Sequence, residues 1–264
     1  MKALKILFIT QEDPFYVRLF FEEFLANYPH RDEIAGVVIA PTMGNKGLFN
    51  LVRQMYAFYG PVDFVRMGLR FVYYKLMNRL TRVWRTRRFY SIRQVCEHYR
   101  VPVLETTNIN DATFLTSIGS MGVDLIISVA APQIFRDALL SVPKQGCINI
   151  HNAKLPKYRG MLPNFWQMYY GEKAVGTTIH RINAKLDDGD ILLQRESPIE
   201  TGETLEALIR RTKRFGARLM IEAVQDIREG RIQPLANNAA EATYFSFPTK
   251  AQVREFKAMG YRLI

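Results

Sequence analysis

The feature that most constrains the fold of this chain is a repeated alternation of short β-branched segments with longer segments of helical periodicity. Segments such as ILFIT at 6–10 and DLIISV at 124–129 are apolar throughout, as is typical of strands buried on both faces of a parallel sheet. The intervening segments place apolar residues three and four positions apart, which is the pattern of an amphipathic helix. The alternation therefore predicts an open, mostly parallel α/β sheet of about seven strands with helices on both faces.

The predicted elements follow the chain in a regular order. Strands are expected at 6–10, 33–40, 101–105, 124–129, 146–151, 175–182 and 191–198. Helices are expected at 14–28, 111–120, 163–171, 203–229 and 249–259. Residues 42–100 interrupt the alternation and predict two or three helices with apolar and basic faces. We expect a Rossmann-like domain over 1–200 that contains this basic helical insertion, and a helical extension over 201–264 packed on the same domain.

The positive charge of the chain is concentrated in the insertion. The net charge is +11, and residues 46–100 contain twelve Lys or Arg against two acidic residues. These cations could form a solvated helix face, or a surface that attracts an anionic ligand such as a nucleotide-linked sugar or a nucleic acid. A third interpretation is a membrane-surface patch, because aromatic side chains accompany the arginines. These aromatic residues include Phe49, Phe58, Phe64, Phe71, Trp84 and Phe89.

Cysteine usage and the N-terminal segment indicate the compartment. Cys96 and Cys147 form no CxxC pair, which fits a reducing compartment and argues against a disulfide scaffold. The first apolar stretch is short and is followed by Glu12 and Asp13, so it predicts a strand rather than a signal peptide. No apolar stretch reaches the length of a spanning helix. We expect a cytoplasmic protein, with membrane association at the inner face as an option for the insertion.

No glycine-rich phosphate loop occurs in the sequence. The first predicted strand runs into QEDPFY, which offers no glycine for close approach of the backbone to a phosphate. A nicotinamide or nucleoside-triphosphate enzyme is therefore disfavoured despite the α/β alternation.

Two polar residues end the strand predicted at 146–151. The period of two in a strand puts Asn149 and His151 on the same face, at the carboxyl end where α/β sheets bind ligands. An amide is a fixed donor and acceptor, and an imidazole changes protonation near neutral pH. Together they suit the polarisation of a carbonyl while a nucleophile loses its proton. Either residue alone would more often be a satisfied hydrogen bond or an exposed strand end.

Four short motifs follow one another from this strand onward. They are Asn149-Ile150-His151, Leu155-Pro156-Lys157-Tyr158-Arg159-Gly160, Gly176-Thr177-Thr178 and Asp187-Asp188-Gly189. In order and spacing they resemble the signature of the formyltransferase superfamily, which includes methionyl-tRNA, glycinamide ribonucleotide and sugar N-formyltransferases. The resemblance covers about 75 residues, roughly 125 to 200.

The resemblance implies transfer of a formyl group from 10-formyltetrahydrofolate to a primary amine. The residues that match the family's catalytic trio are Asn149, His151 and Asp187. Asn149 would donate to the oxyanion that develops on the formyl group, and protonated His151 would add charge stabilisation. Asp187 would hold His151 in orientation and could relay the amine proton through water.

The resemblance also implies where the two ligands bind. Residues expected at the folate are Val129, Ala130, Ile134, Phe135, Asp188 and Gly189, and residues expected at the acceptor are Tyr158, Arg159 and Gly160. From the residues alone, Asp188 and Asp190 are more simply explained as turn formers. No metal is expected, because no second histidine at helical spacing completes a site with His151, His180 and Asp187.

Two differences between this sequence and the family reduce the range of possible acceptors. The missing glycine-rich turn after the first strand removes the phosphate cradle expected for glycinamide ribonucleotide. The roughly 60 residues after 200 begin with a long helix and leave too little chain for the additional β-barrel domain of methionyl-tRNA formyltransferases. A nucleotide-linked amino sugar is therefore the expected acceptor, with tRNA as the alternative. A formyltetrahydrofolate hydrolase, a non-enzymatic binding protein and a basic RNA-binding module remain as rival functions.

Overall fold

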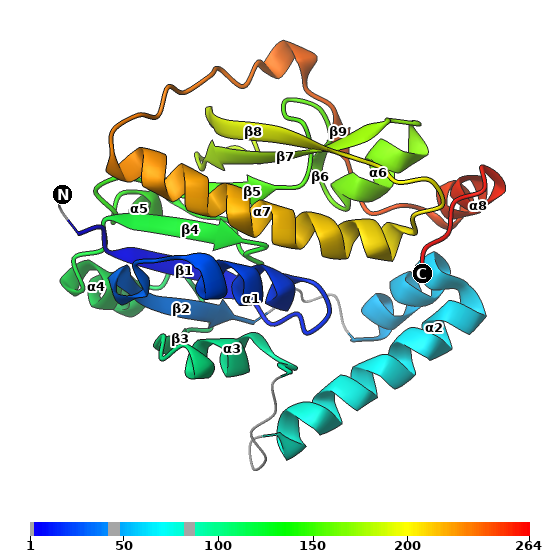
Figure 1. The fold of residues 1–264 in the computed structure, drawn as a ribbon, viewed down its shortest axis with the longest axis horizontal. Coiled ribbons are helices and arrows are strands. Elements are labelled where there is room, and N and C mark those ends of the chain that lie inside the picture. The colour runs from blue at the N-terminus through cyan, green and yellow to red at the C-terminus, as the bar shows by residue number, and fades with distance from the viewer. Residues whose placement is uncertain (1–2, 42–47, 82–87) are drawn as a thin grey trace.

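A computed structural model describes residues 3–41, 48–81 and 88–264 of the chain. Its centre is a seven-stranded sheet in the order β3-β2-β1-β4-β5-β7-β8 (Figure 1). The strands are β1 (Ile6–Gln11), β2 (Ile34–Ala40), β3 (Val103–Glu105), β4 (Leu125–Val129), β5 (Cys147–His151), β7 (Ala174–Arg181) and β8 (Ile191–Pro198). Pairs within β3-β2-β1-β4-β5 are parallel, whereas β7 runs antiparallel to both β5 and β8. The predicted sheet is confirmed.

A second, two-stranded sheet pairs β6 (Arg159–Gly160) with β9 (Tyr244–Phe245). Neither strand was predicted, because two residues are too few for a periodic pattern. The pairing joins the loop after β5 to the C-terminal part of the chain.

The helices are arranged on both sides of the large sheet. They are α1 (Val17–Asn27), α2 (Leu48–Leu80), α3 (Ile92–His98), α4 (Ala112–Ser120), α5 (Asp137–Leu140), α6 (Pro163–Tyr169), α7 (Leu205–Arg228) and α8 (Lys250–Ala258). Short 3₁₀ turns occur at Arg31–Glu33 and Ala239–Glu241. In Figure 1, α1 and α7 cover one face of the sheet, while α4 and α5 lie on the other. Within the described residues no helix is long and apolar enough to cross a membrane.

The first helix starts later than its apolar pattern predicted. The Asp13 carboxylate accepts hydrogen bonds from the backbone N–H groups of Phe15 and Tyr16, at 2.8 and 3.0 Å. These residues therefore form a turn, and the helix begins at Val17.

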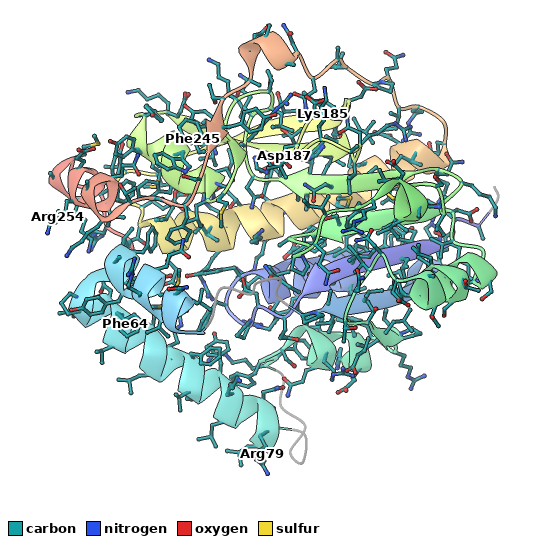
Figure 2. The ribbon with its side chains drawn as sticks, turned by 180° about the vertical axis from the view of Figure 1, so that it is seen from behind. Phe64, Arg79, Lys185, Asp187, Phe245 and Arg254 are labelled. Atoms are coloured by element: carbon teal, nitrogen blue, oxygen red, sulfur yellow. The ribbon has the colours of Figure 1, made fainter. Side chains whose placement is uncertain are left out.

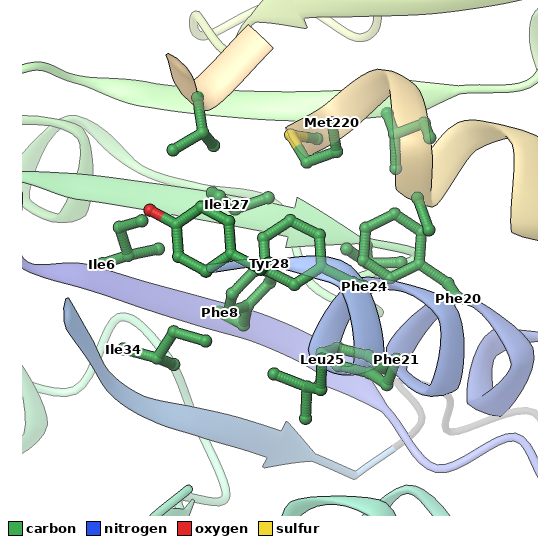
Figure 3. Packing of buried hydrophobic residues seen from close by; sticks show 14 of the residues in the cluster. Ile6, Phe8, Phe20, Phe21, Phe24, Leu25, Tyr28, Ile34, Ile127 and Met220 are labelled. Atoms are coloured by element: carbon green, nitrogen blue, oxygen red, sulfur yellow. The ribbon is translucent and has the colours of Figure 1, made fainter. Parts of the chain in front are cut away.

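The main core lies between the sheet and the α1–α7 layer. Phe8 of β1 meets Phe20, Phe21 and Phe24 of α1, with ring centroids 5.0 to 6.4 Å apart, and Met220 of α7 closes the cluster (Figure 3). Each such side chain stabilises the fold by about 1.5–3 kcal/mol on burial. Helix α7 is capped by Thr204, whose side chain accepts from Ala207 N. The buried residues of α7, among them Met220 and Val224, belong to the same core cluster as the strands.

The basic insertion forms α2, a helix bent at Gly60, which has φ 77° and ψ 174°. Pro61 follows the bend, and the longer arm extends along the edge of the molecule, away from the sheet (Figure 1). Residues 42–47 and 82–87 of the insertion, including Trp84, lie outside the described residues, as does the side chain of Phe49. The end of the insertion contains α3. Phe58, one of the aromatic residues on which the membrane-surface interpretation depends, is buried against Phe165 and Phe247 and faces no lipid. The shorter arm thus uses an aromatic residue to pack on the body of the protein.

Candidate active site

A cavity of about 490 Å³ opens at the carboxyl ends of β4 and β5. Its lining includes Asn149, His151 and Asp187, so the structure brings the three predicted catalytic residues together. Asn149 and His151 come from β5, and Asp187 comes from the loop between β7 and β8. Asp187 lies beyond the strand ends at this edge, near Lys185 (Figure 2). A larger cavity of about 820 Å³, lined by Glu12, Glu105 and other residues, contains none of the three.

A histidine that we had not assigned to the site orients Asn149. His180 of β7 is the register partner of Asn149 across the antiparallel β5–β7 pair. Its Nδ1 lies 2.8 Å from the Arg181 carbonyl oxygen, which can only accept, so Nδ1 carries the proton. Nε2 is then an acceptor in the neutral ring, and Asn149 Nδ2 donates to it at 3.1 Å. This fixes the amide so that its second N–H remains for a ligand.

His180 is neutral because it is buried. The pKa of His180 is lowered to about 4: desolvation is the largest cause, Asp187 opposes it and neighbouring His151 adds to it. The Asp187 Oδ1 to His180 Nε2 distance is 3.7 Å. A neutral ring at this position keeps Nε2 available as the acceptor for Asn149.

The burial of His180 predicts a loss of stability in acid. In the unfolded chain a histidine has a pKa of about 6.5, whereas in the folded protein the pKa of His180 is about 4. Between these values only the unfolded chain binds the proton, so the free energy of unfolding falls as the pH falls. From about pH 7 to about pH 5 we expect a loss of roughly 2 kcal/mol from this residue.

The measurement is urea unfolding at both pH values for the wild type and for His180→Gln. The glutamine variant should lose roughly 2 kcal/mol less than the wild type over this interval. Equal losses in the two proteins would show that His180 does not titrate differently on unfolding.

His151 presents one ring nitrogen to Asp187. Its Nε2 lies 2.8 Å from the Tyr158 carbonyl oxygen and therefore donates. Its Nδ1 lies 3.7 Å from Asp187 Oδ2, longer than a direct hydrogen bond. Both side chains are buried. Nδ1 is therefore the atom of His151 that can gain or lose a proton towards the cavity.

The loop that carries Asp187 is held in shape by distant residues. Asp187 has φ 49°, and its Oδ2 accepts from the backbone N–H of Gly160 at 3.0 Å. Asn237 Nδ2 donates to the carbonyl oxygens of Asp187 and Gly189, at 2.8 and 3.1 Å. A Cβ at position 189 would lie 2.0 Å from the Arg181 carbonyl oxygen, so only glycine fits there. These contacts aim the carboxylate at the two histidines.

Arg159 lies beneath this loop and is fully buried. Its guanidinium donates to Asp188 Oδ1 at 2.6 Å, to the Tyr244 hydroxyl at 2.8 Å and to Asn237 Oδ1 at 2.8 Å. The hydrogen bond from Arg159 is the main reason that the pKa of Asp188 is below its usual value. Arg159 and Asp188 are therefore both engaged within the protein and lie outside the lining of the cavity.

The other predicted ligand contacts divide into two groups. Ala130, Ile134, Phe135 and Gly160 line the cavity. The remaining five do not: Val129 is buried within β4, Gly189 packs on Arg181, Tyr158 donates its hydroxyl to Glu172, and Arg159 and Asp188 bond to each other as described. The Tyr158 backbone nevertheless contributes to the site through its bond with His151.

Lys213 of α7 is a second residue of the cavity that we had not assigned. Burial lowers the pKa of its ammonium group, and Asp13 opposes that effect. Four cations lie within five positions of this helix, so the sequence pattern does not reveal which one faces the cavity. Across the described ranges, no group of three or more His, Cys, Asp or Glu side chains is arranged to hold a metal ion.

The cavity brings an amide, an imidazole and a carboxylate together at the carboxyl edge of an open α/β sheet, the edge at which enzymes of this architecture bind their ligands. The chain belongs to the formyl transferase family, because the sequence profile of that family matches residues 78–224, more than half of the chain. The matched residues include all of the trio and His180.

Individual relatives agree with this assignment. Methionyl-tRNA formyltransferase from Pelobacter propionicus is 35% identical over 153 residues, which cover 58% of this chain and 48% of that protein. Methionyl-tRNA formyltransferase from Syntrophus aciditrophicus is 41% identical over 127 residues, 48% of this chain and 41% of that protein. The chain thus spans about half the length of the curated relatives it matches.

Solved structures show the same fold over more of the chain. The sugar 3N-formyl transferase WlaRD superposes with a TM-score of 0.58 at 17% identity, over 100% of this chain and 84% of that chain. Glycinamide ribonucleotide transformylase 1 from Symbiobacterium toebii superposes with a TM-score of 0.58 at 18% identity, over 89% of this chain and 96% of that chain. The N-formyltransferase from Helicobacter canadensis superposes with a TM-score of 0.58 at 17% identity, over 99% of this chain and 84% of that chain.

Proposed function

We propose that this protein transfers a formyl group from 10-formyltetrahydrofolate to the primary amine of a nucleotide-linked amino sugar. The observation that carries the proposal is the cavity in which Asn149, His151 and Asp187 meet, with Asn149 oriented by neutral His180. Formyl transfer needs a donor at the developing oxyanion and a group that exchanges a proton with the amine. In the cavity, Asn149 can supply the donor and His151 can supply the group that exchanges the proton.

In the proposed reaction the amine nitrogen bonds to the formyl carbon and the bond between that carbon and the donor nitrogen breaks. The free N–H of Asn149 Nδ2 stabilises the formyl oxygen as it becomes negative. The acceptor nitrogen loses one proton and the donor nitrogen takes one up. His151 Nδ1, facing Asp187 at 3.7 Å, is placed to handle this proton through a bridging water.

The cavity has features that suit a formyl-folate donor. Ala130, Ile134 and Phe135 form an apolar wall, which fits a flat heterocycle. Asn152 also lines the cavity, and its buried Oδ1 has no hydrogen-bond partner within the protein. A buried acceptor without a partner is costly, so Asn152 favours a ligand that brings an N–H. Formylated folates also accompany two solved structures of the same fold: WlaRD was solved with 5-N-formyl-THF and the Helicobacter canadensis enzyme with folinic acid.

Two observations favour an anionic sugar nucleotide as the acceptor. Lys185 and Lys213 line the cavity and can pair with a diphosphate. The Helicobacter canadensis enzyme, which shares the fold over 99% of this chain, was solved with dTDP-3-aminofucose. The second candidate is charged initiator tRNA, because the curated relatives that match at 35% identity or more include methionyl-tRNA formyltransferases.

The proposal predicts which compound gains a formyl group. Purified protein and 10-formyltetrahydrofolate are incubated in parallel with nucleotide-linked amino sugars and with methionyl-tRNA, and products are analysed by mass spectrometry. One amino sugar should gain the mass of a CO unit, and methionyl-tRNA should not. Formylation of methionyl-tRNA alone would transfer the proposal to the second candidate. Formate release without any formylated acceptor would identify a hydrolase.

A further inference from the structure

The helix α2 carries most of the exposed apolar surface in the part of the chain that the structure describes. Eighteen large hydrophobic residues are exposed there, and eleven of them lie on this one helix. Isolated exposed hydrophobic residues are normal on a protein surface, but a contiguous set marks an interaction site.

On the longer arm these residues form one stripe. Val62, Val65, Leu69, Val72 and Leu76 are spaced by three or four positions and are 54 to 72% exposed. This spacing places them on the same face of a helix. The opposite face packs inward through Met67 and Tyr74, which are buried. The outward stripe is therefore not needed to attach the helix to the protein.

Tyr74 shows how that attachment is made. Its ring packs on Phe15 and Tyr90, with centroids 5.3 and 5.6 Å apart, and Arg70 of the same helix pairs with Glu206 of α7 at 2.6 Å. These contacts hold the arm in place independently of the stripe. The stripe is thus available to a partner without rearrangement of the fold.

Cations border the stripe. Arg66, Lys75 and Arg79 are exposed, and Arg79 lies near the free end of the arm (Figure 2). The single acidic residue of α2 is Asp63, whose Oδ1 lies 3.5 Å from Arg66 Nη1 and whose Oδ2 lies 3.9 Å from Lys257 Nζ of α8. Lys75 and Arg79 therefore lie beside the stripe without an acidic neighbour on this helix. Long cationic side chains beside an apolar stripe reach lipid phosphates while the stripe enters the boundary of the acyl chains.

We propose that the outward face of α2 docks on the surface of an anionic lipid bilayer. A bilayer supplies both partners that the face requires, an apolar layer for the stripe and negative charge for the flanking cations. A second copy of this chain is a poorer partner, because two stripes in contact would bring cations of the same sign together and each helix has only Asp63 to offset them. The proposal is independent of formyl transfer, since residues 48–77 lie outside the part matched by the family profile.

The test is co-sedimentation of the full chain with vesicles. One set contains phosphatidylglycerol and phosphatidylcholine in equal parts, and the other contains phosphatidylcholine alone. The protein should pellet with the anionic vesicles at low salt and remain in solution with the neutral ones. High salt should weaken binding, because it screens the cations.

Two double variants separate the stripe from general surface hydrophobicity. Leu69→Ser with Leu76→Ser removes stripe residues that are 68 and 54% exposed, and should weaken binding to anionic vesicles about tenfold or more. Leu235→Ser with Met259→Ser removes residues of matched exposure, 66 and 54%, elsewhere on the surface, and should leave binding unchanged. Circular dichroism of all three proteins verifies that they are folded.

Three outcomes would overturn the proposal. One is a wild-type protein that stays in solution with anionic vesicles at low salt. Another is an equal loss of binding in both double variants. The third is a dimer in light scattering without lipid that the Leu69→Ser/Leu76→Ser protein fails to form, since a second copy would then cover the stripe.

Discussion

Replacing Asn149 with alanine is expected to lower kcat for formyl transfer by roughly two to three orders of magnitude, the usual effect of losing one oxyanion donor. The structure gives the reason for so large an effect. Asn149 Nδ2 already donates one N–H to His180 at 3.1 Å, so the amide cannot rotate and its other N–H is aimed at the cavity. A donor that is oriented in advance stabilises charge in the transition state without reorganisation.

KM should change much less than kcat, because the interaction strengthens only as charge develops on the formyl oxygen. The matched control is Ser128→Ala. Ser128 is the neighbour of Asn149 on β4, is buried and lines the same cavity. Its loss should cost less than about fivefold in kcat, as expected of a polar residue outside the transition state. Similar losses in the two variants would contradict the assignment of Asn149 as the oxyanion donor.

Replacing His151 with glutamine is expected to lower kcat by about 10²- to 10⁴-fold, the range for loss of a general acid–base group. Glutamine can still donate an N–H to the Tyr158 carbonyl oxygen, which now accepts from Nε2 at 2.8 Å. It has no nitrogen that titrates, so it cannot replace Nδ1 opposite Asp187. The substitution thus removes proton transfer while retaining the local hydrogen bond.

Coupling between His151 and Asp187 provides the sharper test. If the two act as one unit, the double variant His151→Gln/Asp187→Asn should be no slower than the slower single variant. If the fold-loss in kcat of the double variant equals the product of the two single losses, Asp187 acts separately from His151. Thermal unfolding of each variant separates damage to the reaction from damage to the fold.

Much of the fold and the core of the site could be predicted from the sequence. Most strands of the large sheet are apolar segments of ordinary length, so their pattern is visible without tertiary information, although β3 has only three residues and β8 is half polar. Asn149 and His151 could be placed on one face of β5 because the side-chain period of a strand is fixed at two. Asp187 could be included through the order and spacing of four motifs.

The role of His180 depended on strand register, which the sequence does not state. The same period of two puts Thr178 and His180 on one face of β7, but only the antiparallel pairing sets His180 opposite Asn149. Lys213 was missed for a related reason. Its helix has cations at several adjacent positions, and the rotation that brings one of them to the cavity is set by packing.

The insertion shows where an amphipathic pattern misleads. Phe58 is an aromatic residue in a basic segment, for which a lipid-facing position was one of three interpretations. The bend at Gly60 instead turns the shorter arm so that Phe58 reaches the core around Phe165. The exposed stripe is made of aliphatic residues on the longer arm, whose direction depends on that bend.

The buried Arg159 has a consequence for the order in which the protein assembles during synthesis. The sheet strands that carry Asn149, His151 and His180 are all complete once residue 198 has left the ribosome. The loop that carries Asp187 already has its bonds to Arg159 and Gly160 at that point, but it lacks Asn237, which donates to the carbonyl oxygens of Asp187 and Gly189 and accepts from Arg159. A nascent chain that stops short of Asn237 can form the sheet but lacks this partner of the loop. We therefore expect the Asp187 loop to reach its final shape only after Asn237 has been synthesised, later than the strands beside it.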